Sequence, residues 1–158
     1  MPLKIDIQNT IDSNQIPDIE EMQSWIVCAL SKVDAKFEHP EITVRIVSIE
    51  ESQQLNLEYR GKDKPTNVLS FPFETPEMIP LEELDELLGD LVICEKVVQQ
   101  EAIDQNKPLQ SHWAHLIIHG LLHLLGYDHM EEQQAQQMEL LEIHIMQELG
   151  FEDPYRPI

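Results

Sequence analysis

The spacing of apolar residues changes twice in the first third of the chain, and this change limits the possible folds more than any other feature. Apolar and polar residues alternate over residues 3–7, which predicts a short strand. From Asp18 to Phe37 the apolar residues recur at helical spacing. Pro40 ends that pattern, and residues 41–47 alternate again. A strand, a helix and a second strand thus follow one another, as in domains that pack helices against a sheet.

The remainder of the chain continues with further elements of both kinds. Ser48 and Glu51 have the spacing of a capping box, so a short helix is expected after Ser48. Pro72 predicts that the next strand is an edge strand or ends there, and the acidic residues 75–88 read as a loop. The sequence therefore predicts a single α+β domain over residues 1–158, with a small mixed sheet of about four strands packed with helices. The later strands are expected at 67–73 and 89–94, and the later helices at 96–106, 109–125 and 130–149.

The composition is that of an ordinary globular protein. A length of 158 residues, 42% of them hydrophobic and 25% charged, suits one domain with its own core. No apolar run approaches the roughly 18 residues that span a bilayer, and residues 1–8 do not resemble an export signal. Cys28 and Cys94 both lie in apolar stretches, as expected of buried thiols in a reducing compartment. We therefore expect a cytoplasmic protein with no membrane partner.

The chain is strongly acidic, with 30 acidic against 10 basic residues and a formal net charge of −20. Such a balance disfavours nonspecific binding to nucleic acid, because phosphate contacts depend on Lys and Arg. The few basic residues are not evenly spread, since Arg60, Lys62 and Lys64 fall within one five-residue stretch.

Five of the seven histidines lie between residues 112 and 129. His119 and His123 are four residues apart on the predicted helix, so both imidazoles can reach one ion at about 2.0–2.1 Å. Gly126 is expected to end the helix in a left-handed conformation, which lets His129 complete a set of three ligands. Three nitrogens with an open fourth position are typical of catalytic zinc on a zincin-like helix. We expect one Zn²⁺ per chain, although nickel or another divalent metal suits the same ligands.

Gly120 argues against a peptidase. A protease-type zinc helix carries a glutamate directly after its first histidine as the general base, and here that position is glycine. A metal site is therefore compatible with the sequence, whereas this hydrolase mechanism is not.

Three segments together resemble the YbeY family of bacterial and organellar endoribonucleases, which act in ribosomal RNA maturation. The stretch from His115 to His129 resembles the family's signature, residues 59–72 resemble a second block, and residues 88–93 resemble a third. In the second block, Asn67 stands where relatives frequently have Asp. The resemblance runs from about residue 55 to His129, and we transfer no motif from residue 130 onward.

The resemblance implies roles for individual residues. His119, His123 and His129 would hold the metal, and His115, one helical turn before His119, would contribute to activity. Its position alone fits an ordinary polar group at a helix start equally well. His112 lies about 10 Å from His119 along the helix axis and is expected at the surface.

Other polar residues are assigned more weakly. Arg60 is the best candidate for gripping a phosphate, because a guanidinium binds two oxygens at once. Lys62 and Lys64 could attract RNA or simply be solvated. Asp128 could orient a ligand imidazole or stabilise a turn, and Asp90 could support the site or cap a strand end.

The resulting hypothesis is a single-strand-specific, metal-dependent endoribonuclease. By resemblance it would act in late-stage 70S ribosome quality control and in maturation of the 3′ terminus of 16S ribosomal RNA. Its expected partners are ribosomal RNA and ribosomal or assembly proteins. The alternative is a ribosome-assembly or RNA-binding factor whose metal is mainly structural, and the acidic charge favours a partner-dependent role in either case.

Overall fold

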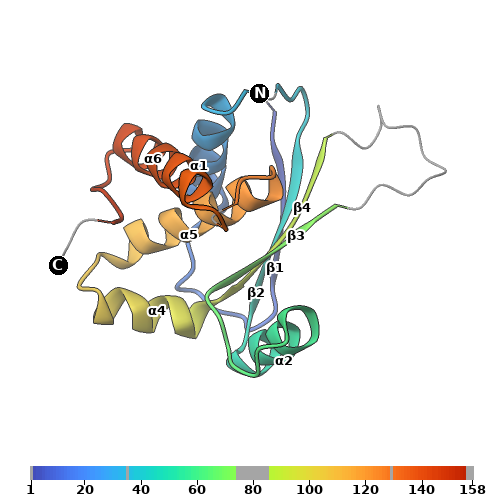
Figure 1. Cartoon of the computed structure of the whole chain (residues 1–158). Coiled ribbons are helices and arrows are strands. Elements are labelled where there is room, and N and C mark those ends of the chain that lie inside the picture. The colour runs from blue at the N-terminus through green and yellow to red at the C-terminus, as the bar shows by residue number, and fades with distance from the viewer. Residues whose placement is uncertain (1, 35, 74–85, 129, 156–158) are drawn as a thin grey trace.

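A mixed sheet forms the frame of the fold in the computed structural model, which describes residues 2–34, 36–73, 86–128 and 130–155 (Figure 1). Its four described strands lie in the order β1-β2-β4-β3. The first three of these pair in parallel, and β3 runs antiparallel to β4 at the edge. The small mixed sheet predicted from the sequence is therefore confirmed. The strands are β1 (Lys4–Asn9), β2 (Glu41–Val47), β3 (Val68–Pro72) and β4 (Leu87–Cys94).

The strand bounds refine two expectations. Pro72 is the last residue of β3, an edge strand, as the missing amide proton of proline predicted. Residues 87 and 88 belong to β4, so the loop expected over 75–88 is wrong at that end. The part of that loop over 75–85 lies outside the described residues.

Five described helices accompany the sheet, at positions close to those expected from the spacing of apolar residues. In α1, Ser31 is the last residue, so the helix is shorter than the pattern up to Phe37 predicted. Val33 and Phe37 still pack against the core without being helical, which explains why their spacing continued the pattern. The helices are α1 (Ile19–Ser31), α2 (Ile49–Arg60), α4 (Glu95–Asp104), α5 (Leu109–Leu124) and α6 (Glu132–Glu148).

Only one of the two hydrogen bonds of the predicted capping box forms at the start of α2. The Ser48 side chain accepts a hydrogen bond from the backbone N–H of Glu51 at 3.2 Å, as expected. The Glu51 carboxylate, however, binds the Arg45 guanidinium at 2.7 Å instead of returning to the backbone of Ser48. A neighbouring strand thus supplied a partner that local spacing could not reveal.

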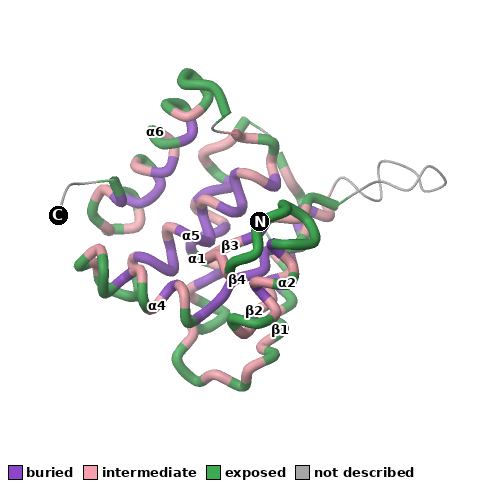
Figure 2. Tube along the Cα trace, turned by 60° about the horizontal axis from the view of Figure 1, so that its bottom comes forward, coloured by how far each residue is buried: buried purple, intermediate pink, exposed green. Residues whose placement is uncertain are grey.

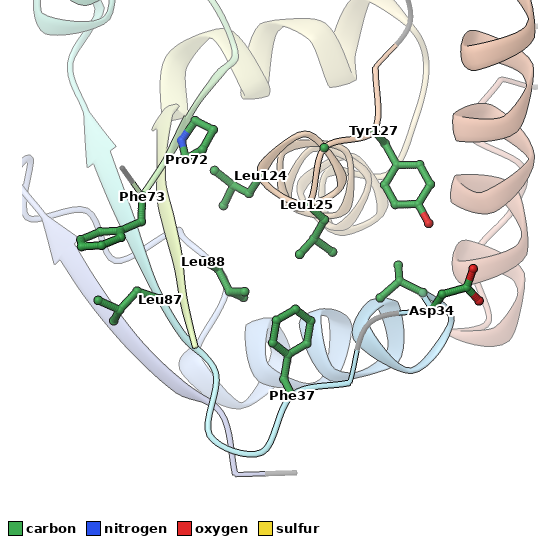
Figure 3. Close-up of a pocket in the computed structure, with 11 residues that line it drawn as sticks. Asp34, Phe37, Pro72, Phe73, Leu87, Leu88, Leu124, Leu125 and Tyr127 are labelled. Carbon is green, nitrogen blue, oxygen red and sulfur yellow. The ribbon is translucent and has the colours of Figure 1, made fainter. Parts of the chain in front are cut away.

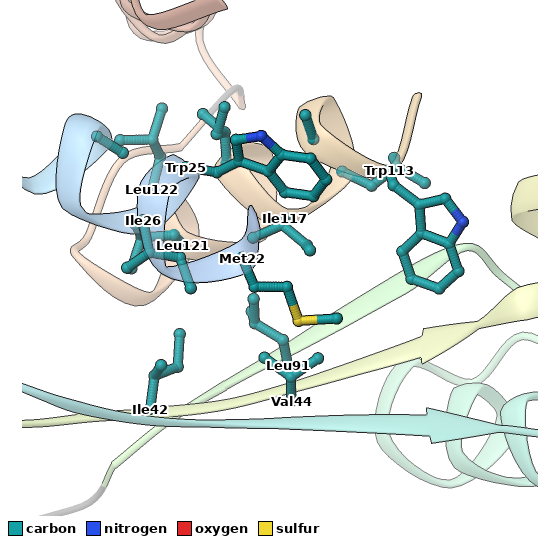
Figure 4. Close-up of a cluster of buried hydrophobic side chains, with 14 of the residues drawn as sticks. Met22, Trp25, Ile26, Ile42, Val44, Leu91, Trp113, Ile117, Leu121 and Leu122 are labelled. Carbon is teal, nitrogen blue, oxygen red and sulfur yellow. The ribbon is translucent and has the colours of Figure 1, made fainter. Parts of the chain in front are cut away.

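The helix α5 lies at the centre of the molecule. It contacts β3 and β4 on one side and α1, α4 and α6 around it, while α2 covers the opposite face of the sheet (Figure 1). Most of α5 is buried, as its purple trace in Figure 2 shows. Ile117 and Leu121 pack against Met22, Ile26 and Leu91 in the main hydrophobic core (Figure 4). Burial on all these sides fixes the direction in which the α5 histidines can point.

Gly120 allows α5 to approach the sheet closely. A Cβ atom at this position would lie 2.8 Å from Leu91 Cδ2 and 3.1 Å from Val68 Cγ2, both on the sheet. The Ser70 hydroxyl also donates a hydrogen bond to the Gly120 carbonyl at 2.9 Å. The residue after His119 therefore faces the sheet, where a larger side chain would have to displace its neighbours.

Across the described ranges, no helix combines the length and apolar character needed to cross a membrane.

Candidate metal centre

Three histidines of α5 lie at successive turns and become more exposed along the helix. The His112 side chain is 4% exposed, that of His115 11% and that of His119 25%. Partly buried His123 follows one turn later. The four-residue spacing read from the sequence therefore places His115, His119 and His123 along one side of the helix.

His119 and His123 turn the same ring nitrogen toward each other. Their Nε2 atoms are 3.2 Å apart, and their ring centroids are 4.6 Å apart. Two nitrogens bound to one tetrahedral ion at 2.0–2.1 Å would be separated by about 3.3–3.4 Å. The observed separation is therefore close to that of two ligands of a shared ion.

Glu142 of α6 is the polar centre of this cluster. Its carboxylate is fully buried and lies 2.8 Å from Nδ1 of His119 and 2.5 Å from Nε2 of His115. The Tyr155 hydroxyl donates a third hydrogen bond to it at 2.5 Å. Because an ionised carboxylate can only accept hydrogen bonds, both histidines must donate to it. In a neutral His119 the proton is then on Nδ1, and the Nε2 lone pair points toward His123.

The ionisation of these groups is consistent with that arrangement. Burial by itself would raise the pKa of Glu142, but the hydrogen bonds from His115 and His119 lower it to about 2. Burial lowers the pKa of His115, which favours the neutral imidazole. Burial and the neighbouring carboxylate raise the pKa of Tyr155, so its hydroxyl keeps the proton that it donates. Glu142 is therefore a buried anion surrounded by three donors.

Two overlapping sets of residues could hold a metal ion. Donor atoms of His115, His119 and Glu142 all lie within 4.8 Å of one another, so this group could bind one. The facing Nε2 atoms of His119 and His123 offer a second position, to which His129 would belong according to the sequence. His129 lies outside the described residues, and the three-histidine set stays a prediction. The identity of the metal does not follow from either set.

The turn after α5 has the expected conformation. Gly126 has a φ of 99°, in the range that glycine adopts more readily than other residues. Asp128 follows two residues later and is partly buried. Its suggested role in orienting a ligand stays a prediction.

Asp90 does not join the histidines. It lies inside β4 and is exposed, so it does not cap a strand end. Side chains alternate between the two faces of a strand, and Val92 and Cys94 belong to the smaller hydrophobic cluster on the α2 side. Asp90 therefore lies on the face of the sheet opposite α5. Its suggested supporting role failed because the sequence alone does not show which face of the sheet each helix covers.

His112 is buried, so the expected surface position is wrong. Its Nε2 lies 3.0 Å from Glu101 of α4, and its side chain is closed off from solvent. Distance along the helix axis was a poor guide because α4 packs over this part of α5.

A polar cavity of about 450 Å³ lies beside His115 and His119. Asn67 at the start of β3, Glu101 of α4 and Tyr155 after α6 also line it. The cavity thus gathers polar side chains from separate parts of the chain next to the candidate metal ligands, as expected of a site for a small polar group.

Another cavity, of about 490 Å³, lies at the opposite end of the histidine series (Figure 3). Leu88, Leu124 and Phe37 point into it, and Asp34 is the only charged side chain among its described lining residues. Its described lining residues do not include the grouped nitrogen donors found at the polar cavity, so we place the candidate chemistry at the polar cavity.

The three basic residues predicted to contact RNA lie close in sequence to a residue of the cavity wall, but they do not line the polar cavity themselves. Arg60 is exposed at the end of α2, on the other side of the sheet from α5. Lys62 and Lys64 are also exposed, and the segment that carries them leads to Asn67 in the cavity wall. None of the three is among the described lining residues of that cavity. A substrate that touches both Arg60 and His119 would therefore have to extend beyond the cavity.

The fold and the histidine–carboxylate cluster define a small α+β protein with a candidate metal centre on a central helix. Residues 6–150 match the family model described as endoribonuclease YbeY. Because the match covers most of the chain, the protein belongs to the YbeY endoribonuclease family. Membership supports an endoribonuclease role in ribosomal RNA processing.

A solved structure has the same overall fold. The chain is similar to the protein TM1509 from Thermotoga maritima, whose structure was determined in solution. The two are 22% identical, and the comparison covers 98% of this chain and 99% of the other with a TM-score of 0.55. This likeness supports the α+β fold along the whole length.

Sequence reasoning missed Glu142 and Tyr155, since neither belongs to a recognised block. One signal for Glu142 was available. Buried residues of α6 recur at helical spacing, and Glu142 occupies a place in that series between Met138 and Ile145. A carboxylate on the apolar face of a helix is rare without a partner, and so predicts a buried polar contact.

Proposed function

We propose that this protein is a single-strand-selective, metal-dependent endoribonuclease of the cytoplasm. It would act in maturation of the 3′ terminus of 16S ribosomal RNA and in late-stage 70S ribosome quality control, with ribosomal RNA and ribosomal or assembly proteins as partners. The observation that carries the proposal is the facing pair of Nε2 atoms on His119 and His123, 3.2 Å apart, in a chain of the YbeY family.

The donor set fits a zinc-like ion. Neutral imidazoles are good ligands for such metals, and the hydrogen bond from His119 to Glu142 leaves the Nε2 lone pair of His119 available. We propose His119, His123 and His129 as the ligands of one Zn²⁺ per chain. When bound, the ion would polarise a phosphoryl oxygen or lower the pKa of a bound water.

The protein's own side chains would bind and orient the RNA. We propose that Arg60 grips a phosphate of an RNA strand that extends beyond the polar cavity, through two parallel hydrogen bonds that would hold the strand in place for cleavage. Lys62 and Lys64 would add attraction for the backbone. His115 would contribute to activity through Glu142, because its Nε2 is bonded to that carboxylate and its Nδ1 is buried.

An aromatic side chain beside Arg60 favours a single-stranded substrate. Tyr59 is 60% exposed, and its ring meets Phe71 edge-on with 5.0 Å between centroids. A ring held in this way offers a flat face on which an unpaired base can stack, which a base in a duplex cannot do.

The test is cleavage of labelled single-stranded RNA by purified, zinc-loaded protein, compared with Arg60→Glu. We expect at least a hundredfold loss of cleavage in the variant, with unchanged metal content by elemental analysis. Lys36→Glu makes a similar charge change at an exposed position in another part of the chain, and should keep most of the activity.

Equal trace activity in the wild type and Arg60→Glu would point to a contaminating nuclease. The assembly-factor alternative would then be preferred, because a charge of −20 favours a protein that reaches RNA through partners. Activity confined to assembled ribosomal particles, and still lost in Arg60→Glu, would support a partner-dependent nuclease.

A further inference from the structure

We propose that Glu142 is a positioning residue, which holds His119 in the orientation and tautomer that bind the metal and is itself held by Tyr155 and His115. The inference rests on the proposed function in one respect, that His119 binds a metal through Nε2. It assigns a role to α6 and to the segment after it, which carry no motif of their own.

The direction of the hydrogen bonds around Glu142 supports this positioning role. The Glu142 carboxylate accepts from Nδ1 of His119 at 2.8 Å, so this nitrogen carries the hydrogen. The lone pair of a neutral His119 is then on Nε2, which points at His123. Metal-binding histidines commonly donate their other ring N–H to a carboxylate, which fixes the ring and makes the ligand nitrogen more basic.

Glu142 is placed to accept hydrogen bonds in this arrangement, and not to bind the metal together with the histidines. Its oxygens lie 2.5–2.8 Å from the two imidazole nitrogens, which is hydrogen-bond distance. Ligand atoms around one tetrahedral zinc would be about 3.2 Å or more apart. The carboxylate already accepts three hydrogen bonds, two from histidines and one from Tyr155. For Glu142 to bind the ion with His115 and His119, the protons between these groups would have to leave.

Glu142 is itself held in place by the segment that follows α6. Tyr155 donates to its Oε2 at 2.5 Å and packs edge-on against His115, with 5.3 Å between ring centroids. The backbone carbonyl of Pro154 accepts a hydrogen bond from Lys107 Nζ at 2.6 Å, which ties this segment to the turn before α5. These contacts hold the segment that follows α6 against the buried carboxylate. We expect removal of the Tyr155 hydroxyl to make the orientation of Glu142, and hence of His119, less fixed.

The test compares the zinc affinity of Glu142→Gln and Tyr155→Phe with that of the wild type, by competition with a chromophoric chelator. Loss of such a supporting carboxylate typically weakens metal binding about 10–100-fold. We expect a loss in this range for Glu142→Gln and a smaller loss for Tyr155→Phe, which removes one hydroxyl and keeps the ring. Glu139→Gln is the matched control, because Glu139 lies on the same helix and is exposed.

The absorption spectrum of cobalt-loaded protein separates positioning from coordination. A positioning role predicts the same spectrum for metal-saturated Glu142→Gln and wild type, since the ligand set is unchanged. A changed spectrum in that variant would identify Glu142 as a ligand and overturn the inference. So would unchanged affinities in both variants. Should Glu142→Gln fail to fold, Tyr155→Phe decides alone: weaker zinc binding supports the inference, and wild-type affinity overturns it.

His123→Ala distinguishes failure of this inference from failure of the proposed site. Its zinc affinity should fall far more than that of Glu142→Gln, because a ligand is lost. Wild-type affinity in His123→Ala would refute the proposed ligand set, whatever the result at Glu142.

Discussion

Partly buried polar side chains form a second hydrogen-bonded group that joins different elements. Glu101 of α4 accepts from the Asn67 amide at 3.0 Å and from His112 at 3.0 Å, and so connects the start of β3 with α5. The Asn67 side-chain oxygen also accepts from the backbone N–H of Val68. An aspartate at position 67 could not donate to Glu101, so asparagine suits this contact.

Replacement of Glu101 with Gln tests that group through its pH dependence. Burial would raise the pKa of Glu101, but the hydrogen bonds from His112 and Asn67 overcome it and hold the pKa below its usual value of 4.5. A carboxyl with a lowered pKa stabilises the fold above its unfolded pKa, and this contribution is lost as the pH falls through the folded one. We expect Glu101→Gln to lower the free energy of unfolding by about 1 kcal/mol at pH 7.

The measurement is urea unfolding of both proteins from pH 7 down to pH 3. The difference between them should shrink once the pH falls below about 4.5. A difference that stays constant over this range would show that the ionised carboxylate is not what stabilises the group.

At the scale of elements, the contact between the sheet and the end of α5 depends on glycines. Gly89 in β4 has a φ of 131°, and a Cβ there would lie 2.4 Å from the backbone oxygen of Phe71 and 3.0 Å from Leu124 Cδ2. The obstacle is backbone of the neighbouring strand, which cannot move aside as a side chain can. Glycine at position 89 therefore lets β4 pair closely with β3 and leaves room for Leu124 at the end of α5.

We expect Gly89→Ala to reduce the free energy of unfolding by about 2–4 kcal/mol, from strained backbone together with overpacking. Gly61→Ala is the matched control: Gly61 also has a positive φ, of 70°, but nothing lies within 4 Å of the added Cβ. That variant should lose only about 1–2 kcal/mol. Equal losses in urea unfolding would show that the close approach at Gly89 is unimportant.

For the whole molecule, the dominant electrostatic feature is the charge of −20. Like charges repel more strongly in the compact state than in the unfolded chain, and salt screens this repulsion. The same charge explains why the proposed RNA contacts are confined to the short basic segment around Lys62.

We therefore expect the melting temperature of metal-free protein at pH 7.5 to rise by several degrees between about 20 mM and 500 mM NaCl. The control is the same salt series near the isoelectric point of about 4.4, where the net charge and hence the effect should nearly vanish. A melting temperature at pH 7.5 that is flat or falls with salt would contradict this account.

Local rules were sufficient for much of the fold. Alternation of apolar residues identified β1 and β2, and short apolar runs identified β3 and β4. Helical spacing identified α4, α5 and α6 within a few residues, and α1 with its end placed too late. These local rules failed where a side chain contacts a residue from a distant part of the chain. Glu51 binds Arg45 instead of completing its cap, and His112 is covered by α4.

Spacing alone was enough to predict that His119 and His123 share a helix face, because four residues make about one turn of any α-helix. The packing of α6 against α5 brings Glu142, 23 residues beyond His119, to where its buried carboxylate accepts a hydrogen bond from that histidine. The tertiary structure also decided that Asp90 faces away from the site. Spacing along the chain encodes neighbours within one element, whereas contacts between elements depend on which faces pack together.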